Sequence, residues 1–325
     1  MELDHSGFNC IDLFKYIMVY AVVTIHIGAM GAYIFPAPVE WTIRQAVPFF
    51  FIVSGFLMTR KAVCLKGKEL QRFYISRGLK FFRLWGVWAL VYLPVCIAST
   101  WGTGSFESLA SSFVLNMLFR GEYAIAWPLW YLYALAFYCF AMAFTVRWRI
   151  ASGLFVMVCT GLMIVQWLYF NGLSDSSLVR YTGIGTERNF CGAFYVIVGS
   201  LVYKMRECRQ KILPGLVLAG LSAAMFMVNA PFWPAVGGAG FAILATGIVL
   251  PASHIWFSLR EQSMWIFYTH MYVVWIFCNM DLPDFIRTSA CWFFVVVLVC
   301  CGLLALALWR LQRLPSCRFL TFLIK

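Results

Sequence analysis

Charged residues are scarce in this chain, and its apolar segments follow one another so closely that no soluble domain fits between them. Only 12% of the 325 residues are charged and 63% are hydrophobic, whereas soluble domains have about a quarter charged and about half apolar residues. The mean hydropathy is +0.83. This composition excludes a globular protein with a single anchor. It predicts one all-helical transmembrane domain over residues 1–325.

The sequence also lacks the signatures of metal sites, disulfide frameworks and cleavable leaders. None of its 12 cysteines belongs to a CxxC pair or to a Cys/His cluster with zinc-site spacing. Most lie inside apolar runs, where cysteine behaves as a small hydrophobic residue. The first apolar run is too long for a signal peptide, and no small-residue cleavage site follows it. We therefore expect no metal and no cleaved leader.

Basic residues outnumber acidic ones, 25 against 13, which gives a formal net charge of +12. In a soluble protein such a charge would suggest a nucleic-acid partner. In a membrane protein it follows from the enrichment of Lys and Arg in cytoplasmic loops and from their contact with anionic lipids. We therefore expect membrane lipids, and no nucleic acid, around the basic segments.

The apolar runs predict a polytopic bundle of about ten transmembrane helices. Lipid offers no hydrogen-bond partners to backbone groups, so an open chain crosses it only as helices. The alternating pattern of a membrane barrel is absent from these runs. The predicted spans are 11–35, 44–60, 84–100, 127–146, 150–170, 189–203, 212–230, 235–251, 263–280 and 289–309.

The distribution of basic residues around these spans predicts their orientation. Counted over alternate connections, nineteen basic residues fall on one side of the membrane and five on the other, with Lys15 inside the first span. Because positive charge favours the cytoplasmic side, both termini are predicted to be cytoplasmic. The two longest external connections are then 101–126 and 171–188. They either hold a polar acceptor or are simply solvated loops.

Two ionisable residues stand out in the first span, Lys15 and His26. Ionisable groups at membrane depth are costly and usually mark functional sites. Their spacing of eleven positions is three turns plus about 20°, so both lie on one helix face about 16 Å apart along the axis. A neutral imidazole in the outer half of the span can accept a proton from a hydroxyl, which makes His26 a candidate general base.

Structural interpretations of the same two residues stay open at this point. His26 can be a packing histidine that is hydrogen-bonded to a neighbouring helix. Lys15 lies one turn from the cytoplasmic end, where its side chain can reach the membrane surface. It can also pair with Asp12, three residues earlier on the same face.

Basic residues are dense between the second and third spans, over residues 60–83. Arg77, Lys80 and Arg83 are spaced by three, so they share one helical face and can bind phosphates together. Orientation and contact with anionic lipids explain most of the positive charge in this segment, but they do not require this ordered triplet.

Several segments resemble motifs of the acyltransferase-3 family of membrane acyltransferases, in the family's order and over nearly the whole chain. Lys15 and His26 match the Arg/Lys-x10-His signature. Lys80 and Arg83 resemble the Arg-x-x-Arg motif ahead of the third helix, with lysine in the place of the first arginine, and Arg77 can supply the missing guanidinium. The segments that resemble the remaining motifs are PFFFIVSGFLM at 48–58, WPLWYLYAL at 127–135 and SMWIFYTHMYV at 263–273.

This resemblance implies transfer of an acyl group, acetyl in particular, from cytosolic acyl-CoA to a hydroxyl of a cell-envelope glycan or lipid-linked sugar. It implies His26 as the general base. Lys15 would position a substrate and offset negative charge on the thioester oxygen. Arg77, Lys80 and Arg83 would hold the CoA phosphates, with the pantetheine arm threading the bundle toward His26.

Ser54, Trp130 and His270, each within one of these segments, are further candidates for the substrate path. Ser54 has an alternative role as a small residue that allows close helix packing. His270 has an alternative role as a satisfied core histidine. Family habit and the charge bias together imply the inner membrane of a bacterium.

Two functions of other classes stay open from the sequence. Intramembrane ionisable residues mark transport paths as well as active sites, and membrane domains of this type occur fused to amino-acid racemases of antibiotic-resistance systems. A transporter or flippase of a small polar solute or glycan lipid is therefore the alternative. A non-catalytic membrane scaffold is a third possibility, in which replacement of His26 would have no effect.

Overall fold

The computed structural model describes residues 9–31, 33–100, 106–170, 187–205, 212–283 and 289–324, and all elements in these residues are helices. The chain divides into two compact units, each built from segments that are far apart in sequence. Unit 1 comprises residues 1–50, 209–226 and 236–325, and unit 2 comprises residues 51–208 and 227–235. The single transmembrane domain over residues 1–325 stays a prediction.

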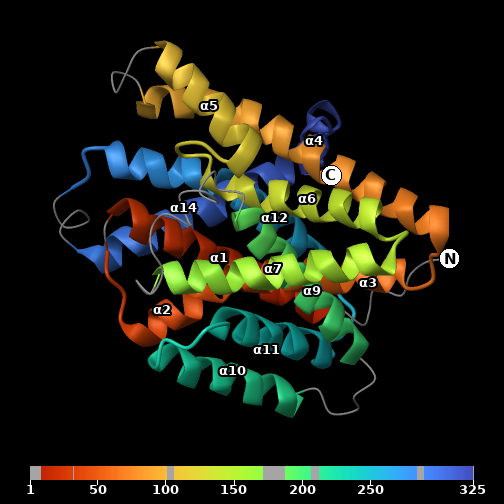
Figure 1. The fold of residues 1–325 in the computed structure, drawn as a ribbon. Coiled ribbons are helices and arrows are strands. Elements are labelled where there is room, and N and C mark those ends of the chain that lie inside the picture. The colour runs from red at the N-terminus through yellow and green to blue at the C-terminus, as the bar shows by residue number, and fades with distance from the viewer. Residues whose placement is uncertain are drawn as a thin grey trace. The chain divides into compact units, whose positions relative to one another are not determined.

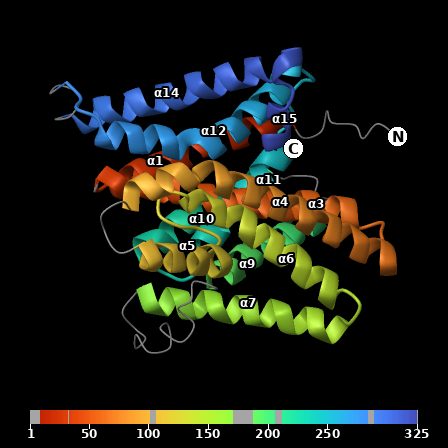
Figure 2. The ribbon, with the colours of Figure 1, turned by 90° about the horizontal axis from the view of Figure 1, so that it is seen from above.

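Unit 1 contains the first helix of the chain and most of the C-terminal ones (Figure 1). Its helix α1 packs against α12, which in turn packs against α14. Figure 2 shows α12 and α14 side by side. The helices of this unit are α1 (Asn9–Gly31), α2 (Ala37–Arg44), α10 (Ile212–Met227), α11 (Trp233–Gly247), α12 (His254–Asn279), α14 (Ala290–Leu311) and α15 (Leu320–Ile324), and the short η4 (Pro315–Cys317) precedes α15.

A buried polar network joins α12 to the end of α14. Glu261 is 5% exposed and Gln312 is 4% exposed. Gln312 donates a hydrogen bond to Glu261 and accepts one from the indole of Trp265, both at 3.1 Å. Because buried polar groups are costly unless they are hydrogen-bonded, this network fixes how α14 lies along α12.

Unit 2 contains the helices of the middle of the chain, and it begins inside α3 (Ala46–Ala62). Helix α4 packs on α6, α6 on α9, and α9 on α7. The remaining helices of this unit are α4 (Gly67–Thr100), α5 (Phe106–Arg120), η2 (Trp127–Leu129), α6 (Trp130–Thr145), α7 (Arg149–Phe170) and α9 (Glu187–Lys204).

Two glycines allow α3 and α9 to approach closely. A Cβ at Gly55 would overlap the backbone carbonyl of Val196, and a Cβ at Gly199 would overlap the carbonyl of Ile52. Small residues at helix contacts are typical of membrane bundles, where close backbone approach replaces the hydrophobic driving force. Glycine is therefore required at both positions.

An apolar outer face on α14 shows why this chain needs lipid around it. Its exposed and buried side chains alternate at helical spacing, yet both sets are apolar, unlike the polar outer face of a helix in a soluble protein. The exposed ones are Trp292, Val295, Val299 and Leu303, and the buried ones are Phe293, Val297, Cys301 and Ala305.

Each of the ten predicted spans coincides with a helix, but fewer helices meet the length and hydropathy expected of a membrane span. Within the described residues, six segments are long and apolar enough to cross a membrane. These are Asn9–Gly31, Ala37–Ala62, Gly67–Thr100, Trp127–Thr145, Ile150–Leu168 and Cys291–Leu311. The count of ten and the cytoplasmic termini therefore stay predictions.

Four segments predicted as connections are helical. Residues 37–43, between the first two predicted spans, belong to α2. The basic residues from position 67 onward are part of α4, which runs unbroken for 34 residues. The connection predicted over 101–126 contains α5. Helix α12 begins at His254, nine residues before the predicted span, because Ser253 caps it by accepting a hydrogen bond from the backbone of Ile255. Residues 171–186 of the other long connection lie outside the described residues.

Candidate active site

Helices α1 and α12 run parallel and bring together two polar clusters. Near their starts, Arg260 lies 3.9 Å from the carboxylate of Asp12. Further along, the ring centroids of His26 and His270 are 5.2 Å apart. Both contacts advance in the same direction along the two helices, so the helices are parallel.

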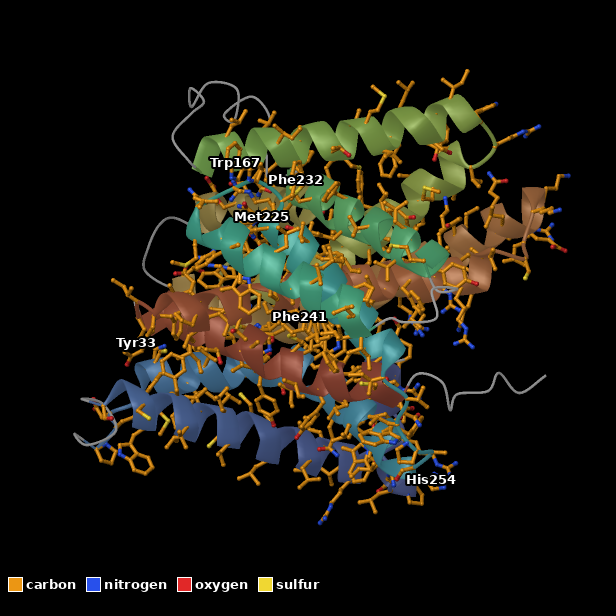
Figure 3. The ribbon with its side chains drawn as sticks, turned by 90° about the horizontal axis from the view of Figure 1, so that it is seen from below. Tyr33, Trp167, Met225, Phe232, Phe241 and His254 are labelled. Carbon is orange, nitrogen blue, oxygen red and sulfur yellow. The ribbon has the colours of Figure 1, made fainter. Side chains whose placement is uncertain are left out.

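The direction of this pair can be followed in Figure 3. His254 is the first residue of α12 and Tyr33 follows α1 closely, and the two labels stand at opposite ends of the pair. The start of α12 therefore lies away from the end of α1, as parallel helices require.

The cluster further along the two helices consists of the imidazoles of His26 and His270. His270 is fully buried, at 0% exposure, and His26 is half-buried. Their rings are tilted by 36° to each other. The Nδ1 of His270 lies 3.0 Å from the carbonyl oxygen of Ile266 and 2.8 Å from that of Phe267. The structure thus places next to His26 a second imidazole whose orientation the backbone of α12 fixes.

The cluster near the starts of the two helices consists of Lys15, Asp12 and Arg260. Lys15 is half-buried and interacts electrostatically with both of the others. Side chains on a helix lean toward its N-terminus, so Lys15 leans toward Asp12 and away from His26. A spacing of eleven positions separates Lys15 from His26 by about 16 Å along α1. The structure therefore does not bring Lys15 to the histidine pair.

Aromatic rings surround α1 one residue before Lys15. The ring centroid of Phe14 lies 6.1 Å from Phe49 and 6.5 Å from Phe241 of α11, and Phe241 lies 6.0 Å from Trp41. Phe241 is labelled in Figure 3 on α11. These rings form an apolar cluster around Phe14, the residue that precedes Lys15 in α1.

In unit 2, the basic triplet occupies successive turns of α4. The guanidinium carbon of Arg77 lies 5.4 Å from the ring centroid of Phe73, and Arg77 interacts electrostatically with Cys139 of α6. Arg77 and Lys80 are half-buried, and Arg83 is exposed. The three cations therefore lie along one helix, and their solvent exposure is greatest at Arg83.

Ser54 and Trp130 also belong to unit 2, and the aromatic residues around them form one cluster. The hydroxyls of Ser54 and Tyr131 are 2.8 Å apart. The ring of Trp130 lies 5.2 Å from Phe51 and 5.9 Å from the guanidinium carbon of Arg188. Ser54 thus makes a hydrogen bond, and the close packing of α3 depends on the glycine that follows it.

Sequence reasoning singled out Lys15 and His26 but gave no role to Arg260. A usable signal was present, since both helices carry a cation ten or eleven residues before a histidine. At about 1.5 Å per residue, this spacing gives nearly the same axial distance on each helix. Within the described residues, no group of three or more His, Cys, Asp or Glu residues has a geometry that could hold a metal ion.

Comparisons with known proteins place this geometry in context. A family model described as an acyltransferase domain, of the acyltransferase-3 type, matches residues 8–310. A protein of Enterococcus faecalis named an amino-acid racemase is 26% identical over 206 residues, which is 61% of this chain and 25% of that protein. The chain thus spans about a quarter of the length of that relative. No solved structure matches the chain.

Proposed function

Because this chain belongs to the acyltransferase-3 family and its apolar helices make it an integral membrane protein, we propose that it transfers acetyl groups from cytosolic acetyl-CoA, or a related acyl-CoA. The proposed acceptor is a hydroxyl of a cell-envelope glycan or lipid-linked sugar. The proposed location is the inner membrane of a bacterium, with both termini in the cytoplasm.

His26 is the proposed general base. Its imidazole takes the proton of the acceptor hydroxyl while the hydroxyl oxygen attacks the thioester carbon. The carbon–sulfur bond then breaks, and the proton on His26 passes to the leaving CoA thiolate. The products are an ester and free CoA, and His26 returns to its neutral form.

Lys15 has a narrower proposed role than the sequence implies. The structure places it with Asp12 and Arg260, about 16 Å along α1 from His26. An ammonium at that distance does not reach a thioester oxygen that is being attacked beside His26. We therefore assign Lys15 to positioning of a substrate, and we do not retain a role in offsetting the charge on the thioester oxygen.

Arg77, Lys80 and Arg83 are proposed to bind the phosphates of the CoA nucleotide. Phosphate oxygens accept charge-assisted hydrogen bonds from guanidinium and ammonium groups. The continuity of α4 through this segment supports the proposal, because it presents the three cations on consecutive turns of one helix.

One observation carries the proposal: the half-buried imidazole of His26, held within 5.2 Å of a second buried imidazole, in a helix long and apolar enough to span a membrane. Imidazole is the side chain that most readily exchanges a proton near neutral pH. An enzyme that must deprotonate a hydroxyl within a membrane needs such a group at such a position.

The experiment uses the purified full chain in detergent with radiolabelled acetyl-CoA and a bacterial envelope extract. We expect release of free thiol together with label in the glycan or lipid-linked sugar fraction, both lost in His26→Ala. The matched control is His254→Ala, at the exposed first residue of α12. Absence of thiol release and of label transfer by the unaltered chain would refute the proposed reaction.

Transport of a small solute is the second candidate. The relative from Enterococcus faecalis is named for chemistry on amino acids, and ionisable groups at membrane depth also mark solute paths. Uptake of radiolabelled amino acids by vesicles that contain the full chain, without any use of acetyl-CoA, would favour this function over acyl transfer.

A further inference from the structure

His270 is held in one tautomer by the backbone of its own helix. Its Nδ1 lies within hydrogen-bond distance of the carbonyl oxygens of Ile266 and Phe267, at 3.0 and 2.8 Å. A carbonyl oxygen only accepts hydrogen bonds, so Nδ1 carries the hydrogen. The neutral ring then has its lone pair on Nε2.

That lone pair has no partner within the described residues. The Nε2 of His270 is buried and makes no hydrogen bond there. Leaving a buried acceptor unpaired is costly, and native proteins pair nearly all such groups. A group from outside the chain that donates a hydrogen bond would remove this cost.

His26 shows where such a donor would come from. The two imidazoles are 5.2 Å apart between ring centroids, so a molecule that reacts at His26 also lies beside His270. The hydroxyl that His26 deprotonates has only one hydrogen, and that hydrogen goes to His26. The donor to His270 is therefore a different O–H or N–H of the bound substrates.

We infer that the Nε2 of His270 accepts a hydrogen bond from a neutral O–H or N–H group next to the reacting atoms. Two sources offer this chemistry: a second hydroxyl of a diol-bearing sugar acceptor, and an amide N–H of the pantetheine arm of acyl-CoA. The inference rests on the proposed function, and it makes His270 a substrate-contacting residue.

The first test follows the nitrogen itself. In the full chain labelled with ¹⁵N-histidine in detergent, the four histidines give few ring signals, and His270→Asn identifies those of His270. We expect an Nδ1-protonated ring with an unbonded Nε2. The Nε2 signal shifts on addition of S-ethyl-CoA if the donor is the pantetheine amide, or of methyl glucoside if it is a sugar hydroxyl. The inference is overturned if neither probe shifts the Nε2 signal. It is also overturned if Nε2 is already hydrogen-bonded before a probe is added.

The second test separates a substrate contact from a packing role. His270→Asn keeps a donor near the position of Nδ1 and deletes Nε2, whereas His270→Phe keeps the ring volume and deletes both nitrogens. We expect kcat/KM for acetyl transfer to fall about tenfold in both, as for one lost hydrogen bond, with an unchanged melting temperature in His270→Phe. The matched control is His254→Asn on the same helix.

The outcomes keep the two proposals apart. Acetyl transfer at an unchanged rate in both variants overturns the contact at His270 and leaves the proposed function standing. A fall in transfer that only parallels a fall in melting temperature also overturns the contact. If the unaltered chain transfers no acetyl group, the proposed function fails, and the nitrogen signals still report whether His270 meets the donor or the sugar.

Discussion

The two units of this protein handle polar groups in different ways. In unit 1 the buried polar side chains include an imidazole, a carboxylate and several amides, among them His270, Glu261 and Gln312. In unit 2 the buried carboxylate of Glu122 is paired with Arg188. Other contacts between its helices use neutral hydroxyls, such as Thr59 with Ser200 at 2.7 Å, and glycines that admit close backbones. Both units contain helices apolar enough for a membrane.

This difference identifies which part of the bundle carries chemistry. Neutral hydroxyls that bond to each other add little cost in an apolar setting and serve to hold helices together. Ionisable groups at membrane depth are expensive. The buried carboxylate of unit 2 is accounted for by its ion pair with Arg188, whereas the imidazole pair of His26 and His270 in unit 1 needs a functional explanation. Changes to unit 1 should therefore affect turnover, and changes to the helix contacts of unit 2 should affect stability.

The largest expected effect is a loss of acetyl transfer when the imidazole of His26 in unit 1 is replaced. His26→Gln should lower acetyl transfer by about 10²–10⁴-fold, because a neutral amide cannot accept the proton of the acceptor hydroxyl. The melting temperature in detergent should stay close to that of the unaltered chain. Transfer and melting are measured on the same preparation, and retention of more than a tenth of the rate would contradict the role of His26.

The next largest effect is on helix contact in unit 2. Gly55→Ala should destabilise the protein by about 1–3 kcal/mol, because the added methyl overlaps the carbonyl of Val196. Gly161→Ala on α7 is the matched control, since a Cβ there meets nothing within 4 Å. It should be neutral or stabilising, by up to about 1 kcal/mol. Equal melting temperatures for the two variants would show that the close approach of α3 and α9 is not needed.

A smaller effect is expected from the cations of α4, which are the exception to a purely structural unit 2. Lys80→Ala combined with Arg83→Ala should raise the KM for acetyl-CoA about tenfold, the change expected for loss of about 1.4 kcal/mol of binding. Turnover of acetyl-pantetheine, which has no nucleotide phosphates, should not change.

The control for this pair removes the same charge from the same segment. Lys66 and Lys68 are exposed around the start of α4, and their replacement by alanine should leave the KM for acetyl-CoA unchanged. A similar rise in both double variants would mean that general positive charge, and not the ordered triplet, attracts the donor.

The smallest effect is expected at the hydroxyl contact between α3 and α9. Thr59→Val removes the donor to Ser200 and keeps the volume of the side chain. It should lower stability by about 1 kcal/mol, the net value of one hydrogen bond, and leave kcat for acetyl transfer unchanged. A loss of turnover at normal stability would place unit 2 hydroxyls in the reaction and weaken the contrast between the units.

Most helices of this fold can be predicted from the sequence, because the backbone groups of an apolar run in lipid must form their hydrogen bonds within a helix. The exceptions share a cause. Residues from position 67 to 83 and from 106 to 120 are helical, but their mixed or basic composition looks like loops when hydropathy alone is used. Gly78 is tolerated inside α4 because it lies against Phe140, a contact that the local sequence does not reveal.

The candidate site was predictable only within single helices. The spacing of Lys15 and His26 follows from helix geometry, so their shared face and axial separation could be derived in advance. Which residues of other helices meet them could not, because His26 and His270 are 244 positions apart and depend on the packing of α1 against α12. The same holds for Asp12 and Arg260.

The parallel course of α1 and α12 has a topological consequence. If two parallel helices both traverse a bilayer, the chain between them must cross that bilayer an odd number of times. Seven crossings lie between the first and ninth predicted spans, which satisfies this parity, whereas six or eight would not. The contacts of Asp12 with Arg260 and of His26 with His270 therefore constrain how often residues 32–253 traverse the bilayer, even though none of those residues takes part in them.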